Sequence, residues 1–331
     1  MTDKISFRYS LIGLWCLFLA TTGSANDLTA LFGNRFAVLD QLARSKVLAG
    51  LDAEIHRNPT NFVYQGQKAT VLIQTGQFDA ALLVCNQLMQ NYNKDLGLSL
   101  RGYAYYGRED YDKAIADFTG VLQSRKTADI YLVRGRANEF KGDYKSALAD
   151  YSDAIELKGN DSRAYYYRSG CQVYFGKIND AISDLSRALQ LSSVRPPTVY
   201  ADRGELYFLK GDYARAIADY NQALQLATNC VEALNNYAWI LAVCPDPQIR
   251  NGRKSVEYAR QACDLNLWKD ASCLATLAAA CAETGDYTAA AEWQTKAIKC
   301  GAPDSSLKTA GQILQLYNQH QPYRVQPLVS N

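Results

Sequence analysis

Histidine is scarce in this sequence, and the scarcity limits the catalytic chemistry that the chain can support. Of 331 residues only His56 and His320 are histidines, and both lie in terminal segments. A Ser, Cys or Thr nucleophile is usually activated by an adjacent base, most often histidine. A Gly-rich phosphate loop after a strand is also lacking, because the recurrent Gly-Asp-Tyr lies in turns between helices. We therefore expect a protein that is not an enzyme and that uses no cofactor.

The chain also lacks an excess of either charge. Its 35 Lys and Arg residues against 33 Asp and Glu residues give a net charge of +2 at pH 7. A nucleic-acid-binding protein would require a basic stripe or a strongly basic isoelectric point. We therefore expect no nucleic acid among its partners.

The apolar run near the N-terminus, residues 11–20, is too short to span a bilayer comfortably. Basic residues precede this run, and Gly23 and Ala25 supply the small residues that a signal peptidase needs. We expect residues 1–25 to be a signal peptide and the chain to be exported, to the periplasm or outside the cell, with no membrane span after cleavage. An uncleaved N-terminal anchor is the alternative.

Cysteine motifs typical of metal sites are absent. Apart from Cys16 in the signal segment, the cysteines show no CxxC spacing and no Cys/His cluster, so a zinc site is not expected. Most occupy repeat positions where a small apolar residue packs, and a free cysteine behaves as one. We expect buried thiols. One or two disulfides in the C-terminal third, such as Cys230–Cys263, are the alternative.

What the chain does contain is an internal repeat of about 34 residues, clearest at residues 128–161. Two amphipathic helices, at about 129–140 and 144–157, flank the turn Lys141-Gly142-Asp143. Counted from Ala128, small residues fall at unit positions 8, 20 and 27, and large apolar or aromatic residues at 4, 17, 24 and 30. Small residues let antiparallel helices approach, and large ones fill the seam with the next unit. This layout resembles the tetratricopeptide repeat. The resemblance implies an all-α fold, a right-handed α-solenoid of antiparallel helix hairpins.

The repeat register divides the chain into segments. We expect an N-terminal helical cap or degenerate repeat at 26–61, five tetratricopeptide repeats at 62–230, two divergent repeats with an extended turn at 231–300, and a C-terminal capping helix and tail at 301–331. Residues 233–324 resemble a paired C-terminal module of exported bacterial tetratricopeptide proteins. In that module an Ala-Trp pair opens the segment and the turn is lengthened, here by Pro245-Asp246-Pro247.

Four units share an Arg at position 7 and an Asp at position 23. The separation of 16 residues places the two side chains on facing helices of one hairpin, so we predict a repeated ion pair within each unit. Two side chains that simply point to solvent are the alternative. A partly exposed pair would contribute only about 0–1 kcal/mol. The predicted pairs are Arg101/Asp117, Arg134/Asp150, Arg168/Asp184 and Arg203/Asp219.

Binding is the function that the repeat leaves open. In tetratricopeptide families the first helices of successive units line a concave groove, so the resemblance implies that unit positions 2, 5, 9 and 12, with their neighbours 6 and 13, face a partner. Aromatic and Arg enrichment is typical of interaction surfaces. Packing of several of these side chains between units, as core, is the alternative. Carried onto this sequence, the groove residues are Tyr103, Tyr106, Arg136, Phe140, Arg163, Tyr166, Tyr167, Tyr174, Asp202, Glu205, Phe208, Asn235, Asn236 and Trp239.

The resemblance therefore implies a scaffold that binds a protein or peptide of unknown identity. Chaperone-binding members hold a terminal carboxylate with a Lys/Asn/Arg clamp, which is not recognisable here. The corresponding positions hold Ser99, Leu132, Val133, Gly170 and Ala201. A structural subunit of a cell-envelope assembly is one alternative function. Recognition of a carbohydrate or small molecule by the groove aromatics is another.

Overall fold

The computed structural model describes residues 41–301 and 304–325. They belong to two compact units, an N-terminal unit of residues 41–171 and a C-terminal unit that begins at residue 172. The boundary lies inside helix α9, Ser162–Tyr174. The predicted signal peptide at 1–25 and the first part of the predicted cap lie outside the described residues.

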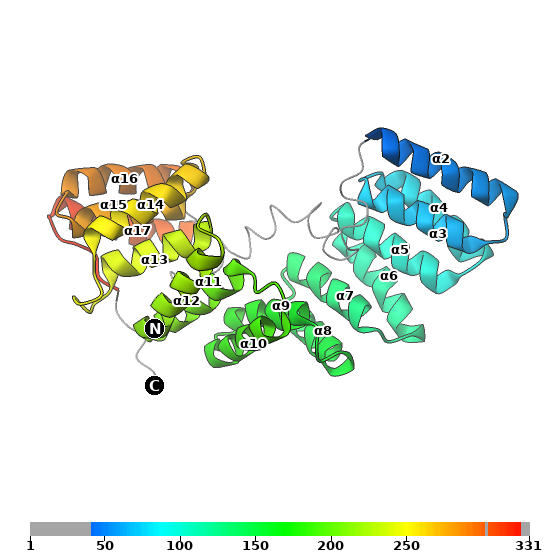
Figure 1. Ribbon diagram of the computed structural model, residues 1–331, viewed down its shortest axis with the longest axis horizontal. Helices are drawn as coiled ribbons and strands as arrows, with labels where there is room; N and C mark the ends of the chain where they lie inside the picture. Colours follow the sequence, from blue (N-terminus) through cyan, green and yellow to red (C-terminus); the bar gives the residue numbers. More distant parts are fainter. Residues whose placement is uncertain (1–40, 302–303, 326–331) are drawn as a thin grey trace. The chain divides into compact units, whose positions relative to one another are not determined.

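The N-terminal unit consists of one single helix followed by helix hairpins (Figure 1). The single helix is α2 (Gln41–Arg57). The hairpins are α3 (Phe62–Gln74) with α4 (Phe78–Asn91), α5 (Lys94–Gly107) with α6 (Tyr111–Ser124), and α7 (Ala128–Phe140) with α8 (Tyr144–Leu157), and the first ten residues of α9 complete the unit.

The C-terminal unit continues the pattern with one longer turn and a final helix (Figure 1). After α10 (Ile178–Leu191), its hairpins are α11 (Pro197–Leu209) with α12 (Tyr213–Leu226), α13 (Val231–Val243) with α14 (Gly252–Leu265), and α15 (Ala271–Glu283) with α16 (Tyr287–Lys299), and the final helix is α17 (Asp304–Asn318). Residues 244–251 form the extended turn between α13 and α14.

The predicted all-α fold class is confirmed. The described residues form 16 helices and no strand. In the clearest repeat the helices at 128–140 and 144–157 differ from the predicted ranges by one residue. Periodicity alone locates these helices because each one presents an apolar stripe to its neighbours.

Short polar residues fix where many of the helices begin. An Asn or Asp before the helix accepts a hydrogen bond from a backbone N–H of the first turn, which satisfies a group that has no partner within the helix. The residues that cap in this way are Asn61, Asn93, Asp143, Asp212, Asn251, Asp270 and Asp286. Where a helix starts at such a residue, its first residue is set by local sequence.

The short turns inside the hairpins place a left-handed residue at unit position 15. Gly142, Gly176 and Gly211 fill this position with φ of 81°, 71° and 79°. In the α5–α6 turn the position is held by Glu109, with φ of 64°. A side chain in this conformation is strained, whereas glycine is not.

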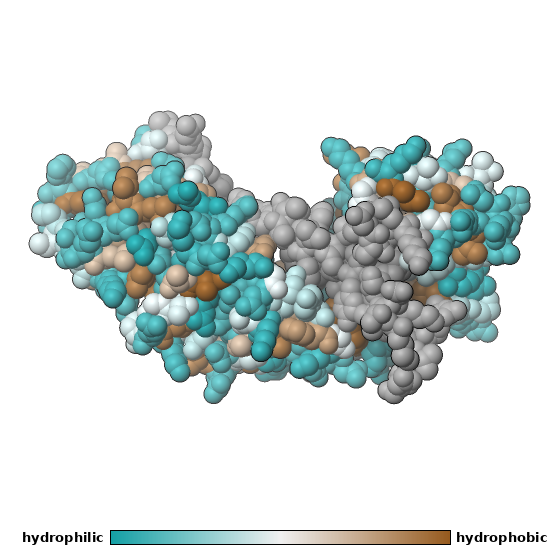
Figure 2. All heavy atoms as spheres, turned by 180° about the vertical axis from the view of Figure 1, so that it is seen from behind, coloured by the Kyte–Doolittle hydropathy of each residue, from teal (hydrophilic) through white to brown (hydrophobic). Residues whose placement is uncertain are grey.

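In Figure 2 the apolar residues among the coloured atoms form separate patches between hydrophilic ones. Within the described ranges, every helix is too short or too polar to cross a bilayer.

Candidate binding surfaces

Arg–Asp pairs lock the first helix of a hairpin to the second. Each Arg uses two of its nitrogens on one carboxylate, and the Asp residues are only 3–6% exposed. Three of the four predicted pairs are formed: Arg101 Nη2 to Asp117 Oδ1 at 2.7 Å, Arg134 Nη2 to Asp150 Oδ1 at 2.6 Å, and Arg203 Nη2 to Asp219 Oδ1 at 2.8 Å. Arg168 lies in the N-terminal compact unit and Asp184 in the C-terminal one, so that pair stays a prediction.

The same Arg residues also reach the preceding hairpin, which the sequence reasoning missed. The third nitrogen, Nη1, donates to a polar side chain at unit position 25 of the repeat before. These contacts are Arg101 to Asn86 at 2.9 Å, Arg134 to Thr119 at 3.0 Å, Arg168 to Ser152 at 3.4 Å and Arg203 to Ser186 at 3.0 Å. Because one guanidinium joins three helices, it fixes the orientation of successive first helices. The recurrence of these polar residues every 33 or 34 positions was the available signal.

A buried guanidinium lies on α7, the first helix of a hairpin in the N-terminal unit. Arg136 is 2% exposed, and its Cζ lies 4.7 Å from the ring centre of Phe140 and 4.5 Å from that of Tyr167. Its charge is balanced by Glu139 at 3.1 Å, which also accepts a hydrogen bond from the Tyr151 hydroxyl at 2.7 Å. Burial lowers the pKa of Arg136, but Glu139 and the tyrosine oxygens outweigh it and raise the pKa well above its usual value.

Aromatic contacts extend from this guanidinium in both directions. Tyr106 meets the edge of Phe140 at 5.9 Å between ring centres, and Tyr166 lies 5.7 Å from Tyr167. Phe140, Tyr166 and Tyr167 are half-buried, so part of each ring faces outward. We call the group Tyr106, Arg136, Phe140, Tyr166 and Tyr167 the Arg136 platform. It connects α5, α7 and α9 through ring and cation–π contacts, which are favourable at these distances.

Two further predicted groove residues of this unit lie on helices that also contribute to the Arg136 platform. Tyr103 on α5 is half-buried, with its ring edge 5.3 Å from Phe118. Arg163 on α9 is held by Asp161 at 2.7 Å and by Asp129 at 3.4 Å. Since Arg163 is tied to two carboxylates, its charge is largely neutralised within the unit.

The C-terminal unit has a partly buried carboxyl group on α11, the first helix of a hairpin. Glu205 on α11 is half-buried, and burial raises its pKa to about 7. Phe208, one turn further along α11, is buried against Tyr213 at 5.8 Å. Tyr174, at the end of α9, is 51% exposed and meets Phe175 edge-on at 5.2 Å.

On α13 the predicted groove residues are an amide pair and a tryptophan. Asn235 donates weakly to Asn236 Oδ1 and Ser272 Oγ, each at 3.4 Å, and its own Oδ1 is buried with no hydrogen-bond partner in the described part of the chain. Trp239 is half-buried, and the ring of Tyr323 lies 5.9 Å from it. The C-terminal tail, which here means residues 321–325, therefore covers part of α13.

The structure corrects the groove prediction for five residues, which belong to the interior. A buried side chain offers a partner little contact area, so these residues lie beneath the surface and support it. They are buried because neighbouring helices approach closely. A unit position carried over from the family does not describe that approach. The five are Tyr106 (3% exposed), Arg136 (2%), Asp202 (8%), Phe208 (9%) and Asn235 (8%).

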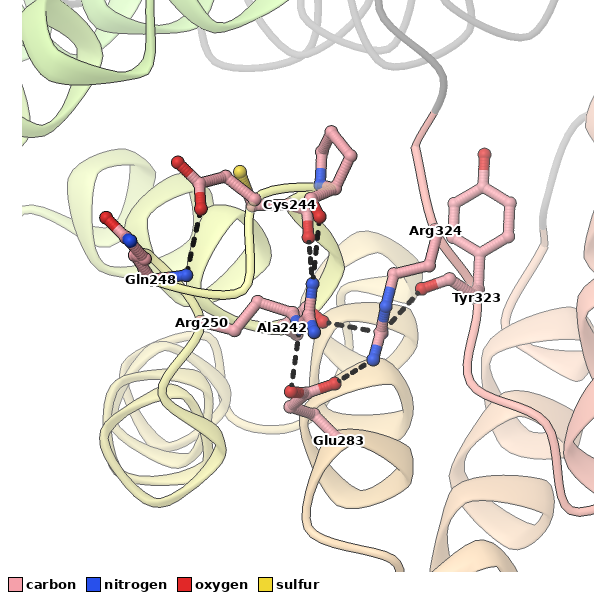
Figure 3. Close-up of polar contacts among 9 residues, drawn as sticks. Ala242, Cys244, Gln248, Arg250, Glu283, Tyr323 and Arg324 are labelled. Atoms are coloured by element: carbon pink, nitrogen blue, oxygen red, sulfur yellow. Dashed lines mark hydrogen bonds and ion pairs between the residues drawn. The ribbon is translucent and has the colours of Figure 1, made fainter.

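A polar network fixes the C-terminal tail to the end of α13 (Figure 3). Glu283 accepts from Arg250 Nε at 3.0 Å through one oxygen and from Arg324 Nη2 through the other. Arg250 also donates to the carbonyls of Cys244 at 2.9 Å and Pro245 at 3.1 Å. Arg324 donates to the carbonyl of Ala242 at 3.1 Å. The extended turn and the tail thus meet at one carboxylate.

The cysteines are free thiols, and no disulfide forms among the eight described ones. The alternative of a Cys230–Cys263 disulfide is therefore not realised. All eight except Cys300 are buried, and burial raises the pKa of Cys85 and Cys263 to about 12 and of Cys230 and Cys281 to about 11. Thiols with such pKa values are poor nucleophiles at neutral pH. No cluster of three His, Cys, Asp or Glu residues that could hold a metal ion occurs in the described ranges.

Family models described as tetratricopeptide repeat match residues 99–169 and 197–230. The first match runs from within α5 through α6, α7 and α8 into α9, and the second covers α11 and α12. The prediction that the chain contains tetratricopeptide repeats is therefore confirmed.

Curated relatives are similar to this chain over part of their length. Human tetratricopeptide repeat protein 13 is 36% identical over 145 residues, which is 41% of this chain and 16% of the relative. Human DnaJ homolog subfamily C member 3 is 25% identical over 243 residues, 67% of this chain and 48% of the relative. The Hsp70-Hsp90 organizing protein of Triticum aestivum is 22% identical over 214 residues, 52% of this chain and 36% of the relative. The chain thus spans less than half the length of each of these proteins.

Solved structures show the same fold at low sequence identity. A chain of the APC/C hetero-tetramer Cut9-Hcn1 is similar with a TM-score of 0.59 and 16% identity, over 81% of this chain and 52% of that one. The C-terminal part of a TPR repeat-containing protein from Cytophaga hutchinsonii is similar with a TM-score of 0.55 and 18% identity, over 74% and 98%. At this identity the similarity shows the fold alone.

Proposed function

We propose that this chain is a non-enzymatic scaffold that binds an extended segment of another protein on the first helices of its repeats. The observation that carries the proposal is the Arg136 platform. Its half-buried rings come from α7 and α9, and they lie around a guanidinium whose charge is already balanced inside the unit. Such a surface offers apolar and aromatic contact area together with polar edges, the composition from which binding hot spots are built.

Rigidity adds to the proposal. The Arg–Asp pairs, each extended to the preceding hairpin, fix the first helices before a partner arrives. Little conformational entropy is then lost on binding, so a few aromatic contacts suffice for useful affinity. An extended segment or a helix can lie along such a row of helices.

The relatives support a protein as the class of partner. The name of the Hsp70-Hsp90 organizing protein describes a protein that acts on other proteins, and its similarity to this chain extends over 52% of the chain. Because this chain has no recognisable clamp for a terminal carboxylate, we propose that it takes an internal segment.

We also propose that the chain is exported, on the basis of the signal-like segment at 1–25 and the resemblance of residues 233–324 to the exported bacterial module. N-terminal sequencing of the chain recovered from the periplasm of an expressing bacterium tests this. We expect the mature chain to begin at Asn26. Recovery of the intact chain from the cytoplasm would contradict export.

A peptide library displayed on phage and selected against the full chain tests the binding function. We expect enriched sequences whose affinity falls at least tenfold in Tyr166→Ala, because this removes an outward-facing ring of the platform. The matched control is Tyr165→Ala, whose ring lies under Arg168 at 5.7 Å and whose hydroxyl donates to Gly159. Circular dichroism checks that both variants fold. No enrichment, or equal loss in both variants, would count against the proposal. Enrichment of glycans in a parallel glycan array would favour carbohydrate recognition instead.

A further inference from the structure

We propose that the C-terminal end of α13 is a binding site for an extended segment of another protein in which an aromatic residue is directly followed by Arg. In this structure the site is filled by the chain's own Tyr323-Arg324-Val325. The inference rests on the proposed function, since it assigns a ligand chemistry to one part of the first-helix faces. It is carried by contacts within the C-terminal unit alone.

The carbonyl groups at the end of α13 are the first component of the site. The last four carbonyls of a helix have no partner within it and must be satisfied from outside. Cys244 N–H donates to the Ile240 carbonyl at 3.1 Å, and Asn251 N–H donates to the Leu241 carbonyl at 2.9 Å, so the extended turn satisfies the first two.

The tail satisfies the other two. Arg324 Nη1 donates to the Ala242 carbonyl at 3.1 Å, and Val325 N–H donates to the Val243 carbonyl at 3.1 Å. Without the tail, or a segment that replaces it, two acceptors at the helix end would lack their protein donors. The end of α13 is thus shaped to receive a backbone N–H and a side-chain donor from an extended strand.

Charge makes that side-chain donor an Arg. The C-terminal end of a helix carries partial negative charge, and Glu283 adds a full one beside it. One Glu283 oxygen is taken by Arg250, a residue of the extended turn that is held in place by the Cys244 and Pro245 carbonyls. The other oxygen and the Ala242 carbonyl are left for a second guanidinium, as Figure 3 shows. A guanidinium reaches both acceptors at once through its planar fork, whereas a lysine ammonium is a single point of charge.

We assign an aromatic residue to the position directly before the Arg of the partner, because Trp239 lies beside the network. The Tyr323 ring is 5.9 Å from the Trp239 ring, and Val325 packs against the apolar core of the unit. Three successive residues thus make three different contacts, a ring contact, a double guanidinium contact and a backbone hydrogen bond. Peptide-binding grooves recognise extended peptides through successive contacts of this kind.

The way in which the tail leaves α17 makes it exchangeable. His320 adopts a left-handed conformation with φ of 57°, and the N–H groups of His320 and Gln321 close the helix on the carbonyls of Tyr317 and Leu316. The helix is therefore complete before the tail begins. Residues 321–325 belong to no helix, and after Gln321 their backbone hydrogen bond to the rest of the unit is the one from Val325 to Val243.

The test uses the full chain carrying Tyr323→Ala and Arg324→Ala, with a fluorescein-labelled peptide of residues 319–325, Gln-His-Gln-Pro-Tyr-Arg-Val. We expect saturable binding, measured by fluorescence anisotropy, that is at least tenfold tighter than binding to the wild-type chain, because the wild-type tail competes. A peptide with Lys in place of Arg, or Ala in place of Tyr, is expected to lose at least tenfold. Adding Glu283→Gln to the double variant is expected to abolish binding.

Several outcomes would overturn the inference. They are no binding to the folded double variant, binding that survives Glu283→Gln, and loss of helix content in both the double variant and the milder Arg324→Gln, which would make the tail an obligatory cap. Concentration-dependent dimers of the wild-type chain that Arg324→Gln abolishes would mean tail exchange between copies and not a different protein. Because Tyr166 lies in the other unit, failure of the library selection and failure of this peptide assay are separate results.

Discussion

Gly135 on α7 lies against the ring of Tyr151 on α8. A Cβ atom at position 135 would lie 2.7 Å from Cε1 and 2.9 Å from Cδ1 of that ring. Gly102 and Gly204 stand in the same relation to Phe118 and Tyr220, at 2.7 Å and 2.8 Å. The rule of a small residue at unit position 8 therefore has a direct cause, which is the aromatic ring at position 24.

Gly135→Ala is expected to destabilise the chain by about 1–2 kcal/mol, because overpacking a core typically costs about 1–3 kcal/mol and alanine regains less than about 1 kcal/mol in helix propensity. The measurement is the urea midpoint followed by circular dichroism. Gly170→Ala on α9 is the matched control, since no heavy atom outside its own helix backbone lies within 4 Å of a Cβ there. That variant is expected to gain stability, and a loss of equal size in both would contradict the explanation.

Glu109→Gly is expected to stabilise the chain by about 1 kcal/mol. Glu109 holds the left-handed turn position that Gly142, Gly176 and Gly211 fill in other units, and a non-glycine residue there costs about 1–2 kcal/mol. Thermal unfolding of the two chains gives the comparison. The reverse exchange, Gly142→Glu, serves as its counterpart and should lower the melting temperature. A melting temperature that is unchanged by both substitutions would show that the turn tolerates side chains.

Arg134→Met is expected to cost about 3 kcal/mol or more, because it leaves the Asp150 carboxylate buried with only Asn138 as a side-chain donor. A partly exposed pair would contribute only about 0–1 kcal/mol, and the burial of Asp150, at 3% exposed, is the reason for the larger value. Adding Asp150→Leu should recover much of the loss, since it removes the unpaired charge. Urea unfolding of both variants provides the measurement.

Lys113→Ala is the control for this ion pair. Lys113 is paired with Asp110 at 2.6 Å, but its side chain is 62% exposed. A surface pair of this kind contributes about 0–1 kcal/mol. If Lys113→Ala and Arg134→Met cost the same, burial is not what makes the Arg–Asp pairs important.

The features that the sequence predicts here are the local ones. Helix limits, the position-8 glycines and the Arg–Asp spacing all depend on residues within one hairpin, where a period of about 34 residues repeats the same contacts. The contact of each Arg with the preceding hairpin recurs equally, yet it becomes visible only when neighbouring units are compared.

Other features depend on contacts that no repeat encodes. Arg136 resembles a surface residue in the sequence, but the rings of Phe140 and Tyr167 and the carboxylate of Glu139 together compensate its burial. The contact between Arg324 and the Ala242 carbonyl joins residues 82 positions apart. Helical periodicity carries no information about such a contact, because the tail has no period of its own.

Glu205 is expected to make the stability of the chain depend on pH between about 4.5 and 7. Its pKa in the folded chain is about 7, above the ordinary value of 4.5, and burial is the cause. The folded state therefore binds this proton more tightly than the unfolded state does. The resulting stabilisation is fully present below pH 4.5 and is lost as pH rises through 7.

Glu205→Gln removes the charge at every pH, so the variant should gain stability relative to the wild type as pH is raised from 5 to 8. Urea midpoints of the two chains at several pH values measure this difference, and Glu292→Gln, at an exposed position of α16, is the matched control. A difference between Glu205→Gln and the wild type that stays constant across this range, or that shrinks as pH rises, would mean that burial does not raise the pKa of Glu205. The substitution can then be tried in the library selection, where a loss of binding above pH 7 alone would identify a partner that contacts the ionised carboxylate.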